Sequence, residues 1–309
     1  MKDFGDSMQA SLKLVKSARR HWAEIAAIAL LSILYVPLMV YWVDGWLNKS
    51  IGIDHEYFSY ALLGFPYAAL IAWELRHRWF VLPDKANFIG LSLIVTGGIF
   101  YLSPLQNLIN LSLPIILCGI VLSTKGLAGV RLMSFPLLFV ALATPTSFPY
   151  IVVPYLLPLQ QFIASVVGFL LMQINMNVTV DQIYVLVNDR LVEVAPYCAG
   201  LKMMMTSVYV GLIILHRTGN IFSRTKTIML LVGAALLSVI VNIIRNTLLS
   251  YFHGTDNTAM FDWLHASWGG DVLSALLLFS VLLMMKGMDK FADSIGTGSS
   301  GDRSKPIAF

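Results

Sequence analysis

The sequence predicts an all-α polytopic membrane protein with about eight transmembrane helices, a small extracytoplasmic β-hairpin, and one interfacial or re-entrant helix near 150–174. Three observations predict this class. Of the 309 residues, 57% are hydrophobic and only 12% are charged, about half the charged fraction of soluble domains. Mean hydropathy is +0.75. The apolar residues form runs long enough to cross a bilayer, and the basic residues gather in alternate connections.

The N-terminal segment 1–20 is basic and precedes the first long apolar run. It contains Lys2, Lys13, Lys16, Arg19 and Arg20. The run from Trp22 to Val43 is long enough to span, because a helix needs roughly 20 residues to cross the hydrocarbon, and it is longer than the core of a secretory signal peptide. We therefore expect 1–20 to be cytoplasmic and 22–43 to be the first span.

Seven further apolar runs are predicted to span the membrane, at 58–74, 87–103, 106–124, 130–144, 199–215, 228–250 and 270–286. Basic side chains, together with two separate histidines, gather in every second connection and after the last run: Arg76, His77, Arg78 and Lys85; Lys125 and Arg131; His216, Arg217, Arg224 and Lys226; Lys286 and Lys290. This alternation is the positive-inside pattern, which places these segments and both termini in the cytoplasm. The connection 251–268 and the segment before Cys198 then face outward.

The segment 150–174 is also apolar, but it is not counted among the eight spans. If it crossed fully, the basic connection 216–226 would lie outside, against the positive-inside pattern. Pro154 and Pro158 interrupt its first part, and proline disfavours a continuous helix. We therefore predict a helix that lies in, or dips into, the outer leaflet.

Residues 176–195 differ from the apolar runs on either side. Their β-branched side chains alternate with polar ones, and Asn188-Asp189 offers a turn. This pattern predicts a small β-hairpin on the outer face that leads directly into Cys198.

The chain is predicted to form one transmembrane domain over 21–290, followed by a polar cytoplasmic tail over 291–309 that is too hydrophilic to fold alone. The tail contains Gly-Thr-Gly-Ser-Ser-Gly at 296–301. This matches G-x-G-x-x-G, but no strand precedes it and no helix follows, so it does not indicate a nucleotide site. The net charge of +4 comes from the basic connections, so we expect contact with membrane lipids and no nucleic-acid partner.

Three polar residues fall in the outward-facing layer: Cys198, Arg245 and His265. Cys198 lies 18 residues before His216, which marks the cytoplasmic end of one predicted helix. Arg245 lies 18 residues after Thr227, at the cytoplasmic start of the next helix. At about 1.5 Å per residue both rise roughly 27 Å, to the same level near the outer interface. His265 precedes the last span and reaches that level too.

These side chains suit acyl transfer through a thiol. A nearby cation lowers the pKa of a thiol and makes Cys198 a nucleophile, His265 can move protons near neutral pH, and Arg245 can stabilise an oxyanion. Each residue alone has an ordinary alternative: a cysteine packs in cores, a histidine lies among interfacial aromatics, and an arginine snorkels to the headgroups. Arg245 nevertheless lies about five residues inside its apolar run, and an intramembrane charge indicates a functional site.

Nothing in the sequence predicts a metal or a cofactor. Cys118 and Cys198 form neither a zinc spacing nor a disulfide framework. The sequence contains no His-Glu-x-x-His motif, and no pair of aspartates lies within the predicted spans. These features disfavour a metallo- or aspartyl intramembrane protease.

Three motifs around these residues resemble those of the exosortase/archaeosortase family. The string around Cys198, Val-Ala-Pro-Tyr-Cys-Ala-Gly-Leu-Lys, resembles the family's Cys-Ser-Gly-Leu. Asn242-Ile-Ile-Arg245 is similar to its Asn-x-x-Arg, and His265-Ala-Ser-Trp-Gly269 to its His-x-x-x-Gly. Their order, their spacing and the number of spans agree, with the motifs confined to 194–270. The resemblance adds three supporting residues to the site: Gly200, Asn242 and Gly269.

The resemblance implies an integral membrane thiol peptidase or transpeptidase in the bacterial inner membrane, with its active site facing outward. Its partners would be exported proteins that carry a C-terminal sorting signal: a motif such as Pro-Glu-Pro, a transmembrane helix and a basic tail. Cleavage would release the protein or transfer it to an acceptor molecule. Two residues depart from the family pattern: Ala199 replaces the usual Ser, and Ala266 follows His265 where an acidic residue is common.

Two other functions compete with this interpretation. A transporter would use Arg245 and Asn242 to bind an anionic solute, but the chain has little internal repeat and its polar residues gather near one interface. A non-enzymatic assembly or transport component for exopolysaccharide export would leave Cys198 without a role. Substitution of Cys198 by Ala separates both from an enzyme.

Overall fold

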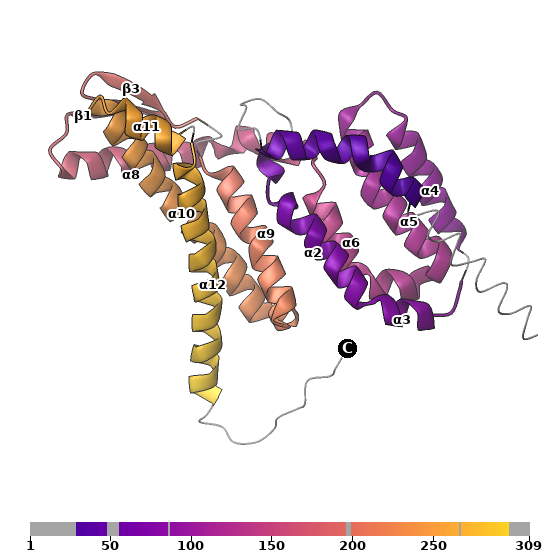
Figure 1. Ribbon diagram of the computed structural model, residues 1–309. Helices are drawn as coiled ribbons and strands as arrows, with labels where there is room; N and C mark the ends of the chain where they lie inside the picture. The colour runs from indigo at the N-terminus through magenta and orange to yellow at the C-terminus, as the bar shows by residue number, and fades with distance from the viewer. Residues whose placement is uncertain (1–28, 48–55, 86, 196–198, 266, 297–309) are drawn as a thin grey trace, which may run out of the picture.

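The computed structural model describes residues 29–47, 56–85, 87–195, 199–265 and 267–296. Two groups of helices lie side by side (Figure 1), and the C-terminal group carries a small sheet at one end. Helix α9 (Leu201–Arg217) connects the groups. It packs against α10 (Arg224–Gly254) and α12 (Gly269–Gly296) of the C-terminal group. Its Tyr209 ring also lies 4.5 Å, centroid to centroid, from Tyr60 of the N-terminal group.

The N-terminal group contains one helix over Ala29–Leu47, the short 3-10 turn η1 (Glu56–Phe58), α2 (Ala61–Glu74), α3 (Arg76–Val81), α4 (Phe88–Tyr101), α5 (Gln106–Leu132) and α6 (Ser134–Ala143). Helices α4 and α5 form one close pair, and α2 and α6 form another. Glycine allows the first approach, since a Cβ at Gly90 would lie 2.3 Å from the Ser123 backbone nitrogen. Aromatic rings fill the core of this group, where Trp42 stacks on Phe65 at 5.8 Å.

The C-terminal group contains α9, α10 and α12 together with α7 (Phe148–Val152), η2 (Val153–Leu156), α8 (Leu157–Gln173), β1 (Val178–Asp181), β2 (Tyr184–Val187), β3 (Arg190–Glu193), η3 (Asn220–Phe222) and α11 (Thr258–His265). Helix α10 is its central element, because it contacts α8, α9, α11, α12 and the sheet. Every predicted site residue with a described position therefore lies on α10 or beside it.

Within the described residues, five helical segments are long and apolar enough to cross a membrane: Ala29–Leu47, Gln106–Leu132, Val153–Gln173, Arg224–Gly254 and Gly269–Lys290. Each of the eight predicted spans contains a helix within the described ranges. However, α2, α4 and α6 have only 10–17 residues. A mostly helical protein with several membrane-spanning candidates is confirmed, whereas the number of eight spans and their orientation stay predictions.

Lys125 was predicted to lie in a connection between two spans, and it lies beside a kink that separates two helical stretches within α5. The kink is at Gly126, which is non-helical (φ 61°, ψ −155°), so the connection between two spans stays a prediction. The side chain of Lys125 is buried, donates to the Leu82 carbonyl at 2.6 Å and pairs with Asp84 at 2.9 Å. These partners satisfy the ammonium within the fold, so the helix does not have to end before it.

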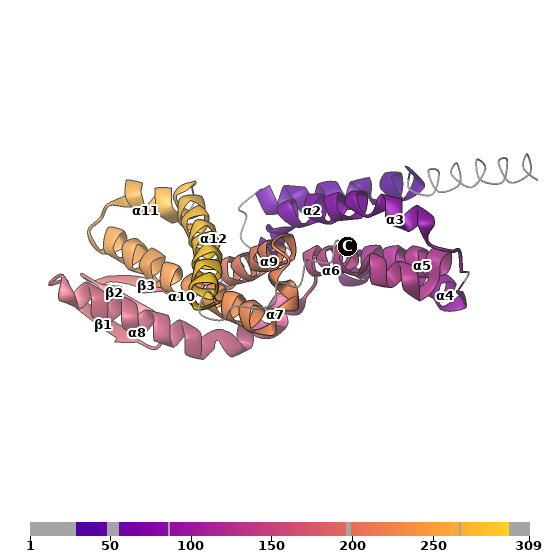
Figure 2. The ribbon, with the colours of Figure 1, turned by 90° about the horizontal axis from the view of Figure 1, so that it is seen from below.

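The segment 150–174 forms α7, η2 and α8 in succession. Pro154 and Pro158 are the second residues of η2 and α8. Proline is tolerated in the first turn of a helix because the N–H there has no helical partner. By length and composition Val153–Gln173 is able to cross a membrane. In Figures 1 and 2, however, α8 runs crosswise to α12. An interfacial position for α8 therefore stays our prediction.

The predicted hairpin is a three-stranded antiparallel sheet with the order β1-β2-β3. The turn expected at Asn188-Asp189 is present, with φ of 47° and 63°. The additional turn between β1 and β2 contains Gln182 at φ 53°, a residue type that gives no turn signal. Valines on one face, including the fully buried Val185 and Val187, pack on α8 and α10.

Candidate functional site

The start of α9 meets α10 at Gly200 and Asn242. Gly200 has a φ of 84°, a conformation that favours glycine, and directly precedes α9. A Cβ at this position would lie 2.7 Å from Cγ of the fully buried Asn242. Only glycine fits both the conformation and the space. The equal spacing that the sequence gives to Cys198 and Arg245 predicts this register of the two helices to within about one residue.

Arg245 lies one turn beyond Asn242 on α10 and points towards the start of α12. Its Nε is buried and has no hydrogen-bond partner among the described residues. A Cβ at Gly270 would lie 3.9 Å from this Nε and 4.0 Å from Nη2, so the guanidinium borders the first turn of α12. A buried donor without a partner carries a free-energy cost. The site thus holds a cationic donor that an incoming acceptor can satisfy.

His265 ends α11 and lies within electrostatic reach of Arg245. Burial lowers the pKa of the imidazole below its ordinary value of 6.5, the Arg245 charge lowers it further, and Asp262 opposes both. The ring stacks on Phe261 at 5.3 Å with an interplanar angle of 10°. A lowered pKa keeps His265 neutral at neutral pH, which leaves one ring nitrogen free to accept a proton.

Gly269 allows the close corner between α11 and α12. A Cβ at this position would lie 2.7 Å from the Trp263 carbonyl oxygen and 2.8 Å from its indole ring. Any side chain here would push α12 away from α11 and would separate Arg245 from His265. The close packing of α11 against α12 therefore explains why a glycine, Gly269, ends the His-x-x-x-Gly motif.

Cys198 lies outside the described residues, and its predicted position beside Arg245 and His265 stays a prediction. The residues on either side contact each other and the rest of the fold. Ala195 and Ala199 are buried, and the Ala199 N–H donates to the Ala195 carbonyl at 2.9 Å. One residue earlier, the Val194 carbonyl accepts from Nε2 of the buried Gln160 on α8 at 2.8 Å. Both ends of the cysteine segment are therefore anchored.

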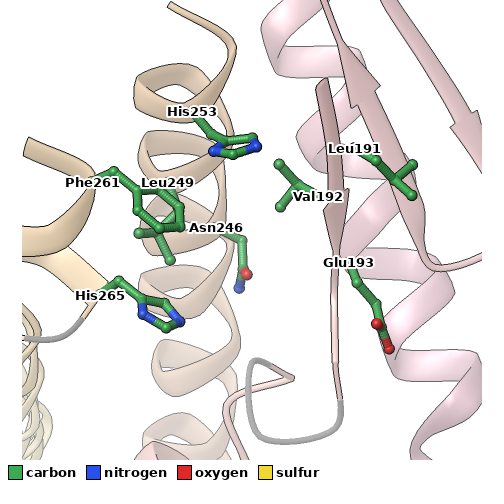
Figure 3. Close-up of a pocket in the computed structure, with 8 residues that line it drawn as sticks. All are labelled: Leu191, Val192, Glu193, Asn246, Leu249, His253, Phe261 and His265. Atoms are coloured by element: carbon green, nitrogen blue, oxygen red, sulfur yellow. The ribbon is translucent and has the colours of Figure 1, made fainter. Parts of the chain in front are cut away.

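A cavity of about 200 Å³ lies beside these residues, between β3, α10 and α11. Figure 3 shows Asn246, Leu249 and His253 on α10, with α11 on one side and β3 on the other. Strand β3 contributes Leu191, Val192 and Glu193, and α11 contributes Phe261 and His265. His265 thus belongs both to the electrostatic pair with Arg245 and to the wall of this cavity.

Comparison with protein families gives one match over residues 46–284, to the family described as transmembrane exosortase (Exosortase_EpsH). The chain belongs to this family. The matched residues include all three motifs. No curated protein and no solved structure matches the chain. Together with the apolar helices, the family establishes a multi-pass membrane protein.

One residue of this exosortase that the sequence analysis did not single out is His253. Its ring lies 5.3 Å from Phe261, and it lines the cavity that also contains His265. The signal is a helical spacing of three and four residues through Asn242, Asn246, Leu249 and His253, which places these side chains on one face of α10. Asn246 belongs to the same row and donates from Nδ2 to the Asn242 carbonyl at 2.9 Å.

The chemistry available to the exosortase site is that of a cation, an imidazole and amides. In the part of the chain that the structure describes, no group of three or more His, Cys, Asp or Glu residues is arranged to hold a metal ion. Arg245 cannot act as a base, because its guanidinium stays protonated. His265 is a group beside Arg245 that can exchange a proton near neutral pH.

Proposed function

We propose that this exosortase is an integral membrane thiol peptidase or transpeptidase. It cleaves the C-terminal sorting signals of exported proteins, each composed of a motif, a transmembrane helix and a basic tail. The reaction takes place on the outer side of the bacterial inner membrane. Cys198 is the nucleophile, His265 is the general acid and base, and Arg245 stabilises the transition state.

One observation carries the proposal most directly: Arg245 is a partly buried cation whose buried Nε has no hydrogen-bond partner in the described chain. A purely structural arginine at this depth would be paired, because an unsatisfied buried donor destabilises the fold. A developing oxyanion provides the missing acceptor, and the planar fork of donors suits it. His265 lies close enough for its pKa to respond to that charge.

The proposed reaction has two steps. His265 accepts the proton of the Cys198 thiol, the thiolate attacks the scissile carbonyl carbon, and Arg245 donates hydrogen bonds to the resulting oxyanion. The oxyanion collapses, the carbon–nitrogen bond breaks, and His265 returns its proton to the leaving amine, which leaves a thioester on Cys198. Water or an acceptor amine then attacks the thioester and releases the product.

The experiment is co-expression of the exosortase with a reporter protein that ends in a motif, a transmembrane helix and a basic tail. The variants are Cys198→Ala, Arg245→Ala and His265→Ala, and the readout is the reporter mass on a gel. Each variant has a matched control elsewhere: Cys118→Ala, the exposed Arg224→Ala at the start of α10, and the exposed His77→Ala on α3. Membrane levels of every variant are measured in parallel.

Shortening of the reporter by the wild type and the three controls, but by none of the site variants, is the expected result. If Cys198→Ala shortens the reporter as well as the wild type does, Cys198 is not the nucleophile. The competing function, a non-enzymatic assembly or transport component for exopolysaccharide export, would then account better for the chain.

A further inference from the structure

The sheet has one edge whose backbone groups face the cavity. In the β2–β3 pair, Val194 donates its N–H to the Ile183 carbonyl at 2.9 Å. Hydrogen-bonded positions alternate along an antiparallel pair, so Val192 and Arg190 also bond to β2. The N–H and C=O groups of Leu191 and Glu193 therefore point away from β2. Within the described ranges, no backbone hydrogen bond reaches them.

This edge forms one wall of the cavity. Leu191, Val192 and Glu193 line it on the sheet side, and α10 forms its floor (Figure 3). The floor residues Asn246 and His253 are seven positions apart, or about 10.5 Å along the helix. An extended chain covers that distance in about three residues. The groove is thus long enough for a short extended peptide, and its Asn246 end borders His265.

An unpaired strand edge is a template for another strand, and natural proteins usually cover or charge such an edge. Here β3 is short, but its outward backbone groups remain open, and Leu191 is 59% exposed. The edge also runs directly into the anchored residues Val194 and Ala195 that precede Cys198. A strand paired with β3 would therefore extend towards the proposed reaction centre.

We propose that the free edge of β3 binds the substrate polypeptide, which adds to the sheet as a fourth strand. The proposal rests on the proposed function and names the form in which that site takes its substrate: an extended segment next to the scissile bond. Backbone hydrogen bonds to Leu191 and Glu193 hold this segment whatever its sequence. The same bonds fix its register relative to Arg245 and His265.

Side chains of the added strand alternate between two environments. Every second one points to the face that packs on α10 and enters the cavity between Leu249, His253 and Phe261. The others point to the opposite face, beside the side chains of Leu191 and Glu193. Side-chain selection by this exosortase therefore has a period of two, with the α10 cavity as the selective subsite.

Disulfide trapping tests the binding mode without requiring cleavage. The exosortase carries Cys118→Ala and Cys198→Ala, plus a single cysteine at Glu193 or, as the control, at the exposed Thr179 on β1. The probe is the reporter with single cysteines at consecutive positions before its transmembrane helix. Directly opposite residues of paired strands have Cβ atoms about 5 Å apart, which suits a disulfide, whereas β1 lies two strands further away.

We expect Glu193→Cys to cross-link the reporter at every second position, and Thr179→Cys to give at least about tenfold less product. Absence of cross-links from Glu193→Cys, equal yields from both cysteines, or yields without the two-residue period would each overturn strand addition. Because the trapping variants lack Cys198, their result does not depend on whether the exosortase cleaves.

Proline substitution tests the same hydrogen bonds in the active protein. Leu191→Pro removes an outward N–H from the β3 edge, a position where a strand tolerates proline. Val178→Pro removes an outward N–H from the opposite edge of the sheet, on β1. We expect Leu191→Pro to reduce reporter cleavage at least about tenfold, a loss that corresponds to about 1.4 kcal/mol, with Val178→Pro near wild type. Equal effects of the two prolines at equal membrane levels would contradict the proposal.

Discussion

The two groups of helices treat their buried polar side chains differently. In the N-terminal group, polar atoms inside the core are paired: Tyr35 with Ser112 at 2.6 Å, and the Trp42 indole nitrogen with Asn110 Oδ1 at 3.0 Å. Within the described residues of this group, the indole nitrogen of Trp46 is the exception. Paired polar groups surrounded by stacked aromatic rings stabilise one packing arrangement.

In the C-terminal group, α10 carries buried polar groups that the described chain leaves without partners. Arg245 Nε and Ser250 Oγ are of this kind. Both lie in the C-terminal half of α10, the half that borders α11 and the cavity. We infer from this difference that the paired polar groups stabilise the N-terminal group, whereas the unpaired donors on α10 are available to the proposed substrate.

The largest expected effect is that of Arg245→Lys. Lysine keeps the charge but loses the planar fork of donors, so it cannot replace the hydrogen bonds to the oxyanion. We expect reporter cleavage to fall by about 10²- to 10³-fold, as for the loss of an oxyanion donor. The measurement is the initial rate of cleavage per membrane-inserted protein. A rate for Arg245→Lys equal to that of Arg224→Lys would place Arg245 with the structural residues.

Two glycines with positive φ allow the crowding at the site to be compared with that of an open position. Gly200 and Gly219 both have a positive φ, but a Cβ would meet Asn242 at the first and nothing within 4 Å at the second. We expect Gly219→Ala to destabilise by about 1 kcal/mol from backbone strain, and Gly200→Ala by about 2 kcal/mol or more. Thermal unfolding in detergent gives both values. If the two variants unfold at the same temperature, the contact between Gly200 and Asn242 does not constrain the site.

A moderate effect is expected from Tyr209→Phe on α9, where this helix contacts the N-terminal group. The substitution removes the hydrogen bond to the Phe139 carbonyl but keeps the ring packing against Tyr60. The loss should be about 1 kcal/mol of unfolding free energy, with the cleavage rate per folded molecule unchanged. A fall in this rate at full folding would show that the N-terminal group takes part in the reaction.

The smallest expected effect concerns the pH dependence of cleavage. Asp262 raises the pKa of His265, against the lowering by burial and by Arg245. In Asp262→Asn the imidazolium loses a stabilising charge, its pKa falls, and the acid limb of the rate profile moves to lower pH. Asp189→Asn, in the turn of the sheet, is the control. A shift to higher pH would contradict the assignment of the acid limb to His265.

Much of this architecture could be predicted because it depends on local pattern. Apolar runs predicted the helices, and equal spacing from one loop predicted that α9 and α10 meet near Gly200 and Asn242. The burial of Lys125 and its pairing with Asp84 beside the kink at Gly126 could not be predicted, because they are tertiary features with no local signal. The third strand was missed because Gln182 turns the chain without glycine, asparagine or aspartate.

Less of the candidate site than of the fold could be predicted from the sequence. The order of the motifs identified Arg245 and His265, which the fold brings within electrostatic reach. His253 and the β3 edge were not identified, because a cavity depends on how three elements pack and not on any one of them.

The most direct test of the account is the alkylation rate of Cys198 by iodoacetamide as a function of pH, measured by mass spectrometry on the purified protein in lipid nanodiscs. It requires no substrate, and Cys118 is an internal control. We predict a midpoint for Cys198 below about 8.5, the ordinary value for a thiol, which moves upward in Arg245→Met. A Cys198 midpoint at the ordinary value, unchanged in Arg245→Met, would contradict activation of the thiol by Arg245.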